Sequence, residues 1–370
     1  MRIASFNLEN MFRRAVAMNR ANWQEGKPIL TAVAKLNDRL EKDVYTAADK
    51  TAILDLIDQL GLTKSDESQF VILRQNRGHL LKRPRSGPPE VVADGRDDFI
   101  GWVDLKTEAV NEIATRMTAK VIQDVRADVL AVSEAEDRIA LTRFDEQLLQ
   151  QLNANYPGIM LIDGNDARGI DVGLMVRPPF RIASIVSHVD DRDSDGERIF
   201  SRDCPEYTLE TAAGEHLLIL VNHFKSKGSG TQSTSDARRK KQAQRVRKIY
   251  DQRRADGVKA IAVVGDFNDT PDSDPLEPLL QNGSDLKDIV DHPKFTSDGR
   301  PGTFANGTAS NKIDYLLLSP ELFAKVTDGG IFRKGVWGGV NGTLFPHYDE
   351  MTAAIHAASD HAAIWADISL

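Results

Sequence analysis

The stretch KAIAVVGDFND (residues 259–269) decides the fold, because it joins an uninterrupted apolar run to a group of polar residues. The run has the composition of a strand that is buried on both faces of a sheet. Asp266 and Asn268 follow it two residues apart, so their side chains share one side if the extended conformation continues. A strand end of this kind holds side chains in place while the loop beyond it keeps them accessible. The alternative is a simple turn, because Gly, Asp and Asn are common turn residues.

Other short runs with strand character lie on both sides of this stretch, and several follow one another without a helix between them. This order indicates antiparallel pairing. Besides 259–265, the expected strands are residues 2–8, 129–134, 158–163, 171–176, 181–187, 206–212, 216–224, 312–319 and 363–370. Helices are expected over 29–60, 106–126, 140–153 and 235–256, and a flexible loop over 228–236. Together these elements predict an α/β fold with two packed β-sheets, mainly antiparallel or mixed, flanked by helices.

Residues 13–103 interrupt this order of strands and helices. They combine a helical pattern with mixed segments and with the loop RPRSGPPE (83–90), which is rich in Pro and Gly. The regular α/β order resumes near residue 106. We therefore interpret residues 1–370 as one domain that carries an insertion at about 13–103.

The composition restricts the classes of function. The 370 residues are 41% hydrophobic and 28% charged, with a formal net charge of −8. This acidic balance argues against nucleic-acid binding over the whole surface, but it allows a phosphate substrate at a local basic patch or metal site. The single cysteine, Cys204, allows no intramolecular disulfide and favours a reducing compartment. The sequence shows no signal peptide and no run of about 18 apolar residues, so we expect a cytoplasmic protein without a membrane span.

Carboxylate and amide side chains at two further strand ends are candidate metal ligands. In VLAVSEAED, Glu134 ends an apolar strand, and a buried carboxylate requires a partner such as a hard divalent cation. A surface salt bridge is the simpler interpretation of Glu134 alone, and Glu136 is the alternative ligand. In SFNLEN (5–10), Asn7 and Glu9 stand two residues apart and can share one side of a strand.

His223, at a strand end, is a candidate general acid or a group that stabilises charge on the leaving group. It ends the apolar run of LILVNHFKSKG, and Lys225 and Lys227 follow it. A lone histidine is more often structural, but several cationic groups at one strand end resemble an anion site.

His361 precedes the last expected strand, in SDHAAIWADI. Its neighbour Asp360 diverges from it, because adjacent side chains in extended chain point to opposite sides. We expect His361 to pair with a distant carboxylate that fixes its tautomer, and Asp314 in the buried strand KIDYLLLS is the best candidate.

Residues 225–254 form a cationic stretch with eleven Lys or Arg and two Asp. The simpler interpretation, which we favour, is a solvated helix face. The functional alternative is a phosphate-binding surface beside His223.

Taken together and in this order, these segments resemble the endonuclease/exonuclease/phosphatase superfamily, which includes pancreatic-type deoxyribonuclease and abasic-site endonucleases. The matching segments are SFNLEN, VLAVSEAED, RGIDVGLMVRP, LVNHFKSKG, VVGDFND, KIDYLLLS and SDHAAIWADI. Each is weak alone, but seven in the correct order are specific. HFKSKG followed by a helix with RxxQA resembles bacterial nuclease-like members in particular. The match spans nearly the whole chain outside 13–103.

The resemblance implies a four-layered α/β sandwich and a set of site residues. The expected metal-site residues are Asn7, Glu134 and Asp360. The expected catalytic residues are His223, Asp266, Asn268, Asp314 and His361. The expected substrate-binding residues are Arg168, Asn222, Lys225 and Lys227. The insertion at 13–103 departs from the small core pattern, and insertions shape the substrate cleft in this family.

The function that follows from the residues and the resemblance is hydrolysis of phosphodiester bonds by metal-assisted attack of water. Mg²⁺ suits a sparse set of oxygen ligands, and Mn²⁺ should substitute for it. Either Asp266 or His361 is the base. The leading substrate is DNA or RNA, motivated by the cationic stretch. The alternatives are a phosphatase or phosphodiesterase for a small-molecule or lipid-derived phosphate, and a binding module without activity. The sequence carries no signal for an oligomeric state.

Overall fold

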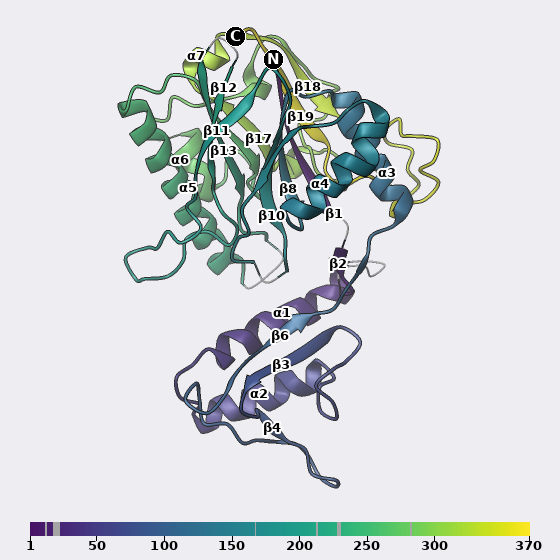
Figure 1. Ribbon diagram of the computed structural model, residues 1–370, viewed down its shortest axis with the longest axis vertical. Helices are drawn as coiled ribbons and strands as arrows, with labels where there is room; N and C mark the ends of the chain where they lie inside the picture. The colour runs from purple at the N-terminus through teal and green to yellow at the C-terminus, as the bar shows by residue number, and fades with distance from the viewer. Residues whose placement is uncertain (12, 18–22, 167, 212–213, 228–230, 282) are drawn as a thin grey trace. The chain divides into compact units, whose positions relative to one another are not determined.

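The apolar run of KAIAVVGDFND forms strand β14 (Ile261–Asp266), which lies inside a six-stranded sheet. The computed structural model describes residues 1–11, 13–17, 23–166, 168–211, 214–227, 231–281 and 283–370. The chain divides into two compact units, one made of residues 1–12, 110–227 and 231–370 and the other containing residues 13–109. Figure 1 draws both units, and each has apolar clusters of its own.

Two mixed sheets form the centre of the first unit. The seven-stranded sheet has the order β16 (Phe295–Thr296), β18 (Val326–Phe332), β19 (Ala363–Ile368), β1 (Arg2–Met11), β8 (Val129–Ala135), β10 (Asp171–Val176) and β9 (Gly158–Leu161). The six-stranded sheet has the order β11 (Arg181–Val186), β12 (Glu206–Glu210), β13 (His216–His223), β14, β17 (Asp314–Leu318) and β15 (Lys287–Asp288). The predicted fold class of two packed sheets flanked by helices is therefore confirmed.

Helices cover the outer faces of both sheets and complete four layers. The helices α3 (Glu112–Val125) and α4 (Arg138–Phe144) lie against the seven-stranded sheet. The helices α5 (Gln232–Ala255) and α6 (Glu277–Leu280) lie against the six-stranded sheet (Figure 1). An apolar cluster fills each of the three spaces between neighbouring layers.

This layering explains why the central strands are apolar along their whole length. In β8, Val129 and Ala131 pack between the two sheets, whereas Leu130 and Val132 pack against the helices. Successive side chains of a strand point to opposite faces, so a strand covered on both faces needs apolar residues at every position.

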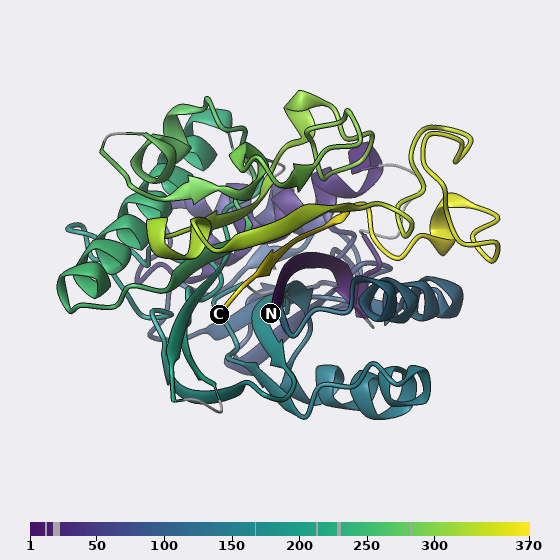
Figure 2. The ribbon, with the colours of Figure 1, turned by 90° about the horizontal axis from the view of Figure 1, so that it is seen from above.

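The strand directions bring the polar strand ends to one edge. β1 pairs with β8 in parallel, and β13 pairs with β14 in parallel, so the members of each pair end at the same edge. β17 is antiparallel to β14 and begins where β14 ends, which sets Asp314 opposite Asp266. At the other end of the unit the chain termini lie side by side (Figures 1 and 2), and the Met1 amino group donates to the carbonyl of Ile368 at 2.9 Å.

Several expected elements differ from the observed ones. The helix expected over 29–60 is two helices, α1 (Trp23–Leu40) and α2 (Ala47–Gln59), because Thr46 begins α2 in a capping box with Asp49. The helix expected over 106–126 begins only at Glu112. Within the loop expected over 228–236, residues 228–230 lie outside the described residues, and Thr231 caps α5, which starts at Gln232.

Strand β18 was not predicted, because its sequence VTDGGIF lacks the usual strand composition. Gly329 and Gly330 both lie close to Trp365 of the neighbouring β19. A strand interior accepts glycine where another group approaches the backbone closely. At Gly330 that group is the indole ring of Trp365, and at Gly329 it is the carbonyl oxygen of Trp365 with the side chains of Ile289 and Phe295.

The second unit is a small α/β assembly. Its helices α1 and α2 and its strand pair β3 (Val71–Arg77) and β6 (Ile100–Leu105) share one apolar cluster. Two short strand pairs accompany them, β2 (Arg13–Ala15) with β7 (Thr107–Ala109) and β4 (Leu81–Lys82) with β5 (Glu90–Val91). The interpretation as one domain with an insertion at about 13–103 stays a prediction. Among the described residues, no helix is both long and apolar enough to cross a membrane.

Candidate active site

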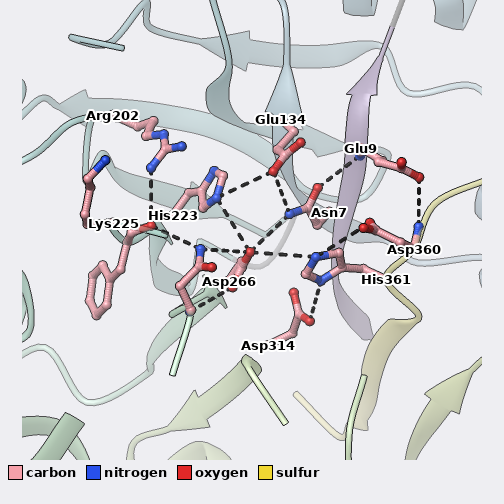
Figure 3. A network of polar contacts seen from close by, with 12 residues as sticks. Asn7, Glu9, Glu134, Arg202, His223, Lys225, Asp266, Asp314, Asp360 and His361 are labelled. Carbon is pink, nitrogen blue, oxygen red and sulfur yellow. Dashed lines mark hydrogen bonds and ion pairs between the residues drawn. The ribbon is translucent and has the colours of Figure 1, made fainter. Parts of the chain in front are cut away.

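Polar side chains from both sheets converge at the edge where β1, β8, β13 and β14 end and β17 begins. Figure 3 shows that Asn7, Glu134, His223, Asp266 and His361 point toward one another. Of these five residues, all but Glu134 are buried, and Glu134 is partly exposed. The arrangement joins residues that the sequence separates widely.

Asn7 connects the two sheets at this point. Its amide nitrogen Nδ2 donates to Oε1 of Glu134 at 3.3 Å and to Oδ2 of Asp266 at 3.2 Å. Asn7 and Glu134 belong to the seven-stranded sheet, whereas Asp266 belongs to the six-stranded sheet. Carboxylate oxygens from two layers therefore lie around a single amide group.

Irregular backbone aims two acidic side chains at the site. Glu134 has a φ of 62° and lies where the register between β8 and β10 shifts. Glu9 has a φ of 50° and lies in the shift between β1 and β8. A bulge redirects a side chain at a strained backbone conformation, and such positions often occur beside active sites. Glu9 consequently does not continue the strand alternation with Asn7, and its Oε2 accepts a hydrogen bond from the backbone amide of Asp360 at 2.9 Å.

Asp266 and Asn268 lie together, but for a reason other than the one predicted. β14 ends at Asp266, and Asn268 has a left-handed φ of 54°. The backbone amide of Asn268 donates to Oδ1 of Asp266 at 2.8 Å, and its Nδ2 donates to Oδ2 at 3.1 Å. The tight turn, not an extended chain, joins the carboxylate to the amide.

His361 and Asp314 form the predicted pair. Nδ1 of His361 lies 2.8 Å from Oδ2 of Asp314, and Thr303 donates its hydroxyl to the same oxygen at 2.6 Å. Ser359 anchors the segment, since its hydroxyl donates to the carbonyl of Asn7 and accepts from the backbone amide of His361. The ring of His361 is thereby held with Nε2 3.9 Å from Oδ2 of Asp266.

The surroundings of His361 and Asp266 move their pKa values in a coupled way. Burial by itself would lower the pKa of His361, but the charge and hydrogen bond of Asp314, with Asp360 and Asp266, raise that pKa well above its usual value. Burial and the neighbouring Asp314 raise the pKa of Asp266 to about 7, although His361 opposes this shift. The negative charge of the buried carboxylates at this centre therefore exceeds the positive charge of the side chains beside them.

His223 faces the same carboxylates from β13. Its Nε2 lies 3.7 Å from Oε1 of Glu134 and 3.6 Å from Oδ2 of Asp266. Burial, together with the nearby Arg202 and Arg168, holds the pKa of His223 well below its usual value. The imidazole is therefore neutral at pH 7 and can donate one hydrogen bond.

Asp360, the third expected metal-site residue, lies at the rim. Its side chain is 46% exposed, and its Oδ1 lies 3.8 Å from Nε2 of His361. Its backbone is tied to Glu9.

The expected substrate-binding residues differ in their exposure. Lys225 is partly exposed beside the site, and Arg168 forms an ion pair with Asp166 at 2.7 Å. Lys227 pairs with Asp269 at 2.7 Å. Asn222 is fully buried within β13, where its amide donates to the carbonyl of Leu220, so it offers no surface for a direct substrate contact.

Most basic side chains of α5 are paired with carboxylates. The pairs are Arg239–Asp269, Lys240–Asp274, Lys241–Asp193, Arg245–Asp191, Arg247–Asp251, Arg253–Glu206 and Arg254–Glu321. These pairs favour the structural interpretation of the cationic stretch over a phosphate-binding surface, because a neutralised face attracts polyanions weakly.

Two buried polar residues of α5 instead position the loop after β13. Gln242 accepts a hydrogen bond from the backbone amide of Lys225 at 2.9 Å, and Arg239 donates to the carbonyl of Lys225 at 2.8 Å. The RxxQA pattern therefore holds both backbone polar groups of Lys225.

Comparison with known proteins agrees with this geometry. A model described as Endonuclease/Exonuclease/phosphatase family matches residues 101–332. The chain belongs to the endonuclease/exonuclease/phosphatase family. Members of this family hydrolyse phosphate esters with the help of a metal ion, and the chain is such a metal-dependent hydrolase. No curated protein sequence matches the chain.

Solved structures of other family members share the fold. A mannosyl-6-phosphatase from Bacteroides thetaiotaomicron is 18% identical, with a TM-score of 0.51, over 70% of this chain and 91% of that chain. An endonuclease/exonuclease/phosphatase from Bacteroides vulgatus is 17% identical, with a TM-score of 0.50, over 70% of this chain and 91% of that one. A further family protein from Bacteroides thetaiotaomicron is 18% identical, with a TM-score of 0.50, over 68% and 85%.

In this family member, several residues that support the site were not predicted from the sequence. Thr303 and Ser359 hold the Asp314–His361 pair, and Arg202 is completely buried beside His223 (Figure 3). No local pattern marks Thr303 or Ser359, because their partners are distant in sequence. No local pattern marks Arg202 either, because its neighbours Ser201 and Asp203 in IFSRDC are polar, as in an exposed segment.

Proposed function

We propose that this phosphoester hydrolase is a Mg²⁺-dependent phosphodiesterase, with a nucleic-acid strand as its leading substrate. The observation that carries the proposal is the convergence of Asn7, Glu134 and Asp266 from two sheets, with His223 and His361 beside them. Carboxylate, amide and imidazole groups in one place are what hydrolysis of a phosphate ester requires.

The donor set fits a hard divalent cation. Glu134 offers carboxylate oxygens, which Mg²⁺ prefers, and Mn²⁺ shares this preference. Oδ1 of Asn7 accepts from the backbone amide of Glu9 at 3.0 Å and keeps a second lone pair for a cation. The raised pKa of Asp266 supports a cation there, because an added positive charge would offset the excess of buried carboxylate. We propose Glu134 and Asn7 as ligands, with Asp360 acting from the rim. Bound Mg²⁺ would supply positive charge to the phosphoryl group.

A second group of side chains also has the spacing of a metal site. Asp266, Asp314 and His361 each place a ligand atom within 4.8 Å of the others. Oδ2 of Asp314, however, already accepts from Thr303 and bonds to His361. We therefore assign these three residues to proton handling and the cation to the Glu134 side of Asp266.

Asp266 is proposed to orient and deprotonate the attacking water. The proposed cation beside it would keep its carboxylate in the charged form that accepts a proton. The two hydrogen bonds from Asn268 fix the carboxylate.

The histidines are proposed to stabilise the phosphoryl oxygens. His361, protonated and oriented by Asp314, presents a positive N–H at Nε2, and neutral His223 presents a single donor. The roles of base and stabiliser then belong to Asp266 and His361 respectively.

Replacement of Asp266 or His361 by Ala tests the assignment. We expect each change to lower kcat by at least about 100-fold, in line with loss of a catalytic base or of a transition-state donor. Circular dichroism should show that both variants stay folded. Turnover near the wild-type level in both variants, with Mg²⁺ supplied, would contradict the roles.

A small phosphorylated compound is the second candidate substrate, and one observation favours it. The paired cations of α5 leave little uncompensated charge on that helix to track a polyanion. We therefore propose a panel of single-stranded DNA, duplex DNA, RNA, inositol phosphates and an aryl phosphodiester, each with and without a chelator.

The panel separates the candidates. A nuclease should turn over the polynucleotides best, with a rate that falls as salt is added. A small-molecule phosphatase or phosphodiesterase should prefer the inositol phosphates and depend weakly on salt. Absence of turnover on the whole panel with Mg²⁺, Mn²⁺ and Ca²⁺ would contradict both proposed substrate classes.

A further inference from the structure

Two arginines share one carboxylate beside His223. Arg168 contacts Asp166 through two nitrogens, with Nε donating to Oδ1 at 2.9 Å and Nη2 to Oδ2 at 2.7 Å. Nε of Arg202 lies 3.1 Å from Oδ2 of the same carboxylate. A single negative charge therefore lies between two positive ones.

These charges are largely removed from water. The side chain of Arg202 is 1% exposed, and those of Asp166 and Arg168 are 12% and 17% exposed. Burial would raise the pKa of Asp166, but Arg168 and Arg202 outweigh it and hold that pKa far below its usual value, so the carboxylate is charged. Buried charge is costly unless it is compensated, and two cations around one anion leave an excess of positive charge.

Lys225 adds a third cation to this group. Burial and the nearby Arg168 and Arg202 lower its pKa to about 8, so it is still mainly protonated at pH 7. Figure 3 shows Lys225 and Arg202 next to each other beside His223. Because Arg239 and Gln242 of α5 hold the backbone of Lys225, its position is fixed by the fold.

One carbonyl group ties this cationic cluster to the reaction centre. The oxygen of Phe224 accepts from Nη1 of Arg202 at 3.2 Å and from Nδ2 of Asn268 at 3.1 Å. Asn268 in turn donates to Asp266. Arg202 is thus connected to Asp266, the proposed base, through the carbonyl oxygen of Phe224 and the side-chain amide of Asn268.

We propose that Arg168 and Lys225, backed by Arg202, form a subsite for a second phosphate group of the substrate, next to the phosphate that is cleaved. Arg168 and Lys225 keep part of their surface exposed and make the contact, while the enclosed Arg202 adds charge and holds the carbonyl of Phe224. Charge-assisted hydrogen bonds to arginine and lysine are strong for phosphate oxygens.

This subsite names a substrate class and rests on the proposed phosphoesterase function. The preferred substrate carries a second phosphate close to the scissile one. The source is either the neighbouring phosphate of a nucleic-acid strand or the second phosphate of a small bisphosphate. The competing explanation is that these cations only offset Glu134 and Asp266, whose charges act on Arg202.

Binding of pyrophosphate to metal-free enzyme in a chelator, measured by calorimetry, tests the subsite without turnover. We expect Arg168→Gln and Lys225→Met each to raise the Kd for pyrophosphate at least about 10-fold, since each removes a charge-assisted contact. Lys240→Met and Arg181→Gln are matched controls, because both residues form exposed ion pairs outside the site, and they should leave the Kd unchanged.

Turnover of matched substrates tests the preference. A dinucleotide with one phosphodiester is compared with the same compound bearing an added 5′- or 3′-phosphate, and a sugar bisphosphate with its monophosphates. We expect the second phosphate to lower KM about 10-fold or more at similar kcat in whichever pair is cleaved, and both subsite variants to lose this gain.

The outcomes are separable. A Kd for pyrophosphate that is unchanged in Arg168→Gln and Lys225→Met, or a KM independent of the second phosphate, would overturn the subsite while leaving the hydrolase function intact. Failure of the proposed function would appear as no turnover of any compound, and the calorimetric comparison would still decide whether the cluster binds an anion.

Discussion

Oδ2 of Asp314 lies 2.8 Å from Nδ1 of His361 and also accepts the hydroxyl of Thr303, so one carboxylate oxygen fixes the orientation of the imidazole. This leaves Nε2 of His361 directed at Asp266. A ring that is held in one tautomer and one rotamer can act on a substrate without reorganisation.

Asp314→Asn should reduce kcat by at least about 100-fold while changing KM little. The amide cannot stabilise the imidazolium of His361, and it favours the wrong tautomer, as in triads where a carboxylate orients histidine. Steady-state kinetics at saturating Mg²⁺ measure the effect. Thr303→Val removes only the supporting hydroxyl and should lower kcat less. Equal losses of kcat in both variants would contradict the conclusion that Asp314, more than Thr303, orients and charges His361.

Asp266→Asn should stabilise the metal-free protein above pH 7 while abolishing activity. The pKa of Asp266 is raised from 3.8 to about 7 in the folded state, so the folded state binds its proton more tightly than the unfolded state. Its contribution to stability is therefore fully present below pH 3.8 and is lost as the pH rises to about 7. We expect the Tm of the variant to exceed that of the wild type by at least about 2 °C at pH 8, and by much less near pH 4.

Thermal unfolding in a chelator at several pH values checks this expectation. Added Mg²⁺ should reduce the difference at pH 8, because the cation compensates the charge that the variant lacks. A Tm difference that does not change between pH 4 and pH 8 would mean that Asp266 keeps an ordinary pKa.

Glu134→Gln should weaken metal activation. The change keeps the shape of the side chain but removes the charge that attracts the cation. We expect the Mg²⁺ concentration for half-maximal activity to rise at least about 10-fold, a loss of about 1.4 kcal/mol in metal binding. Glu136→Gln is the matched control, and if that variant instead showed the loss, the ligand would be Glu136.

Arg239→Met should destabilise the fold, because it removes a buried cation. The side chain is completely buried and its Nε lies 2.9 Å from Oδ2 of Asp269, which is itself buried. Removing one partner of a buried ion pair costs roughly 3 kcal/mol, because buried Asp269 then keeps only Lys227, whose side chain is 48% exposed. Chemical denaturation measures the loss, and Arg181→Met, at an exposed ion pair, should change the free energy of unfolding by less than about 0.5 kcal/mol.

Residues 13–109 should fold as an isolated fragment. They carry their own apolar cluster, which includes Leu36, Ile57, Leu73 and Phe99. A domain with its own core unfolds cooperatively when it is separated from its neighbours. A single cooperative transition in circular dichroism is the expected result, and a gradual loss of signal would show that this segment needs the rest of the chain.

Much of the fold followed from local pattern. The apolar run of β14 predicts a strand buried on two faces, and β14 is such a strand, with Ala262 and Val264 on one face and Ile261 and Val263 on the other. Local pattern failed where a long-range contact decides the conformation. Gly329 and Gly330 lie in β18, where the carbonyl oxygen of Trp365 approaches the first and its indole ring approaches the second.

The sequence by itself determined the order of most strands and helices of the first unit and the type of chemical group at their ends, because alternation and composition are properties of neighbouring residues. Only the tertiary structure decided which groups meet. Asn7 and Asp266 are 259 residues apart, and their contact depends on the pairing of strands in two sheets. The same long-range packing neutralised the cations of α5 and enclosed Arg202 beside His223, since charge pairing and burial depend on distance in space rather than along the chain.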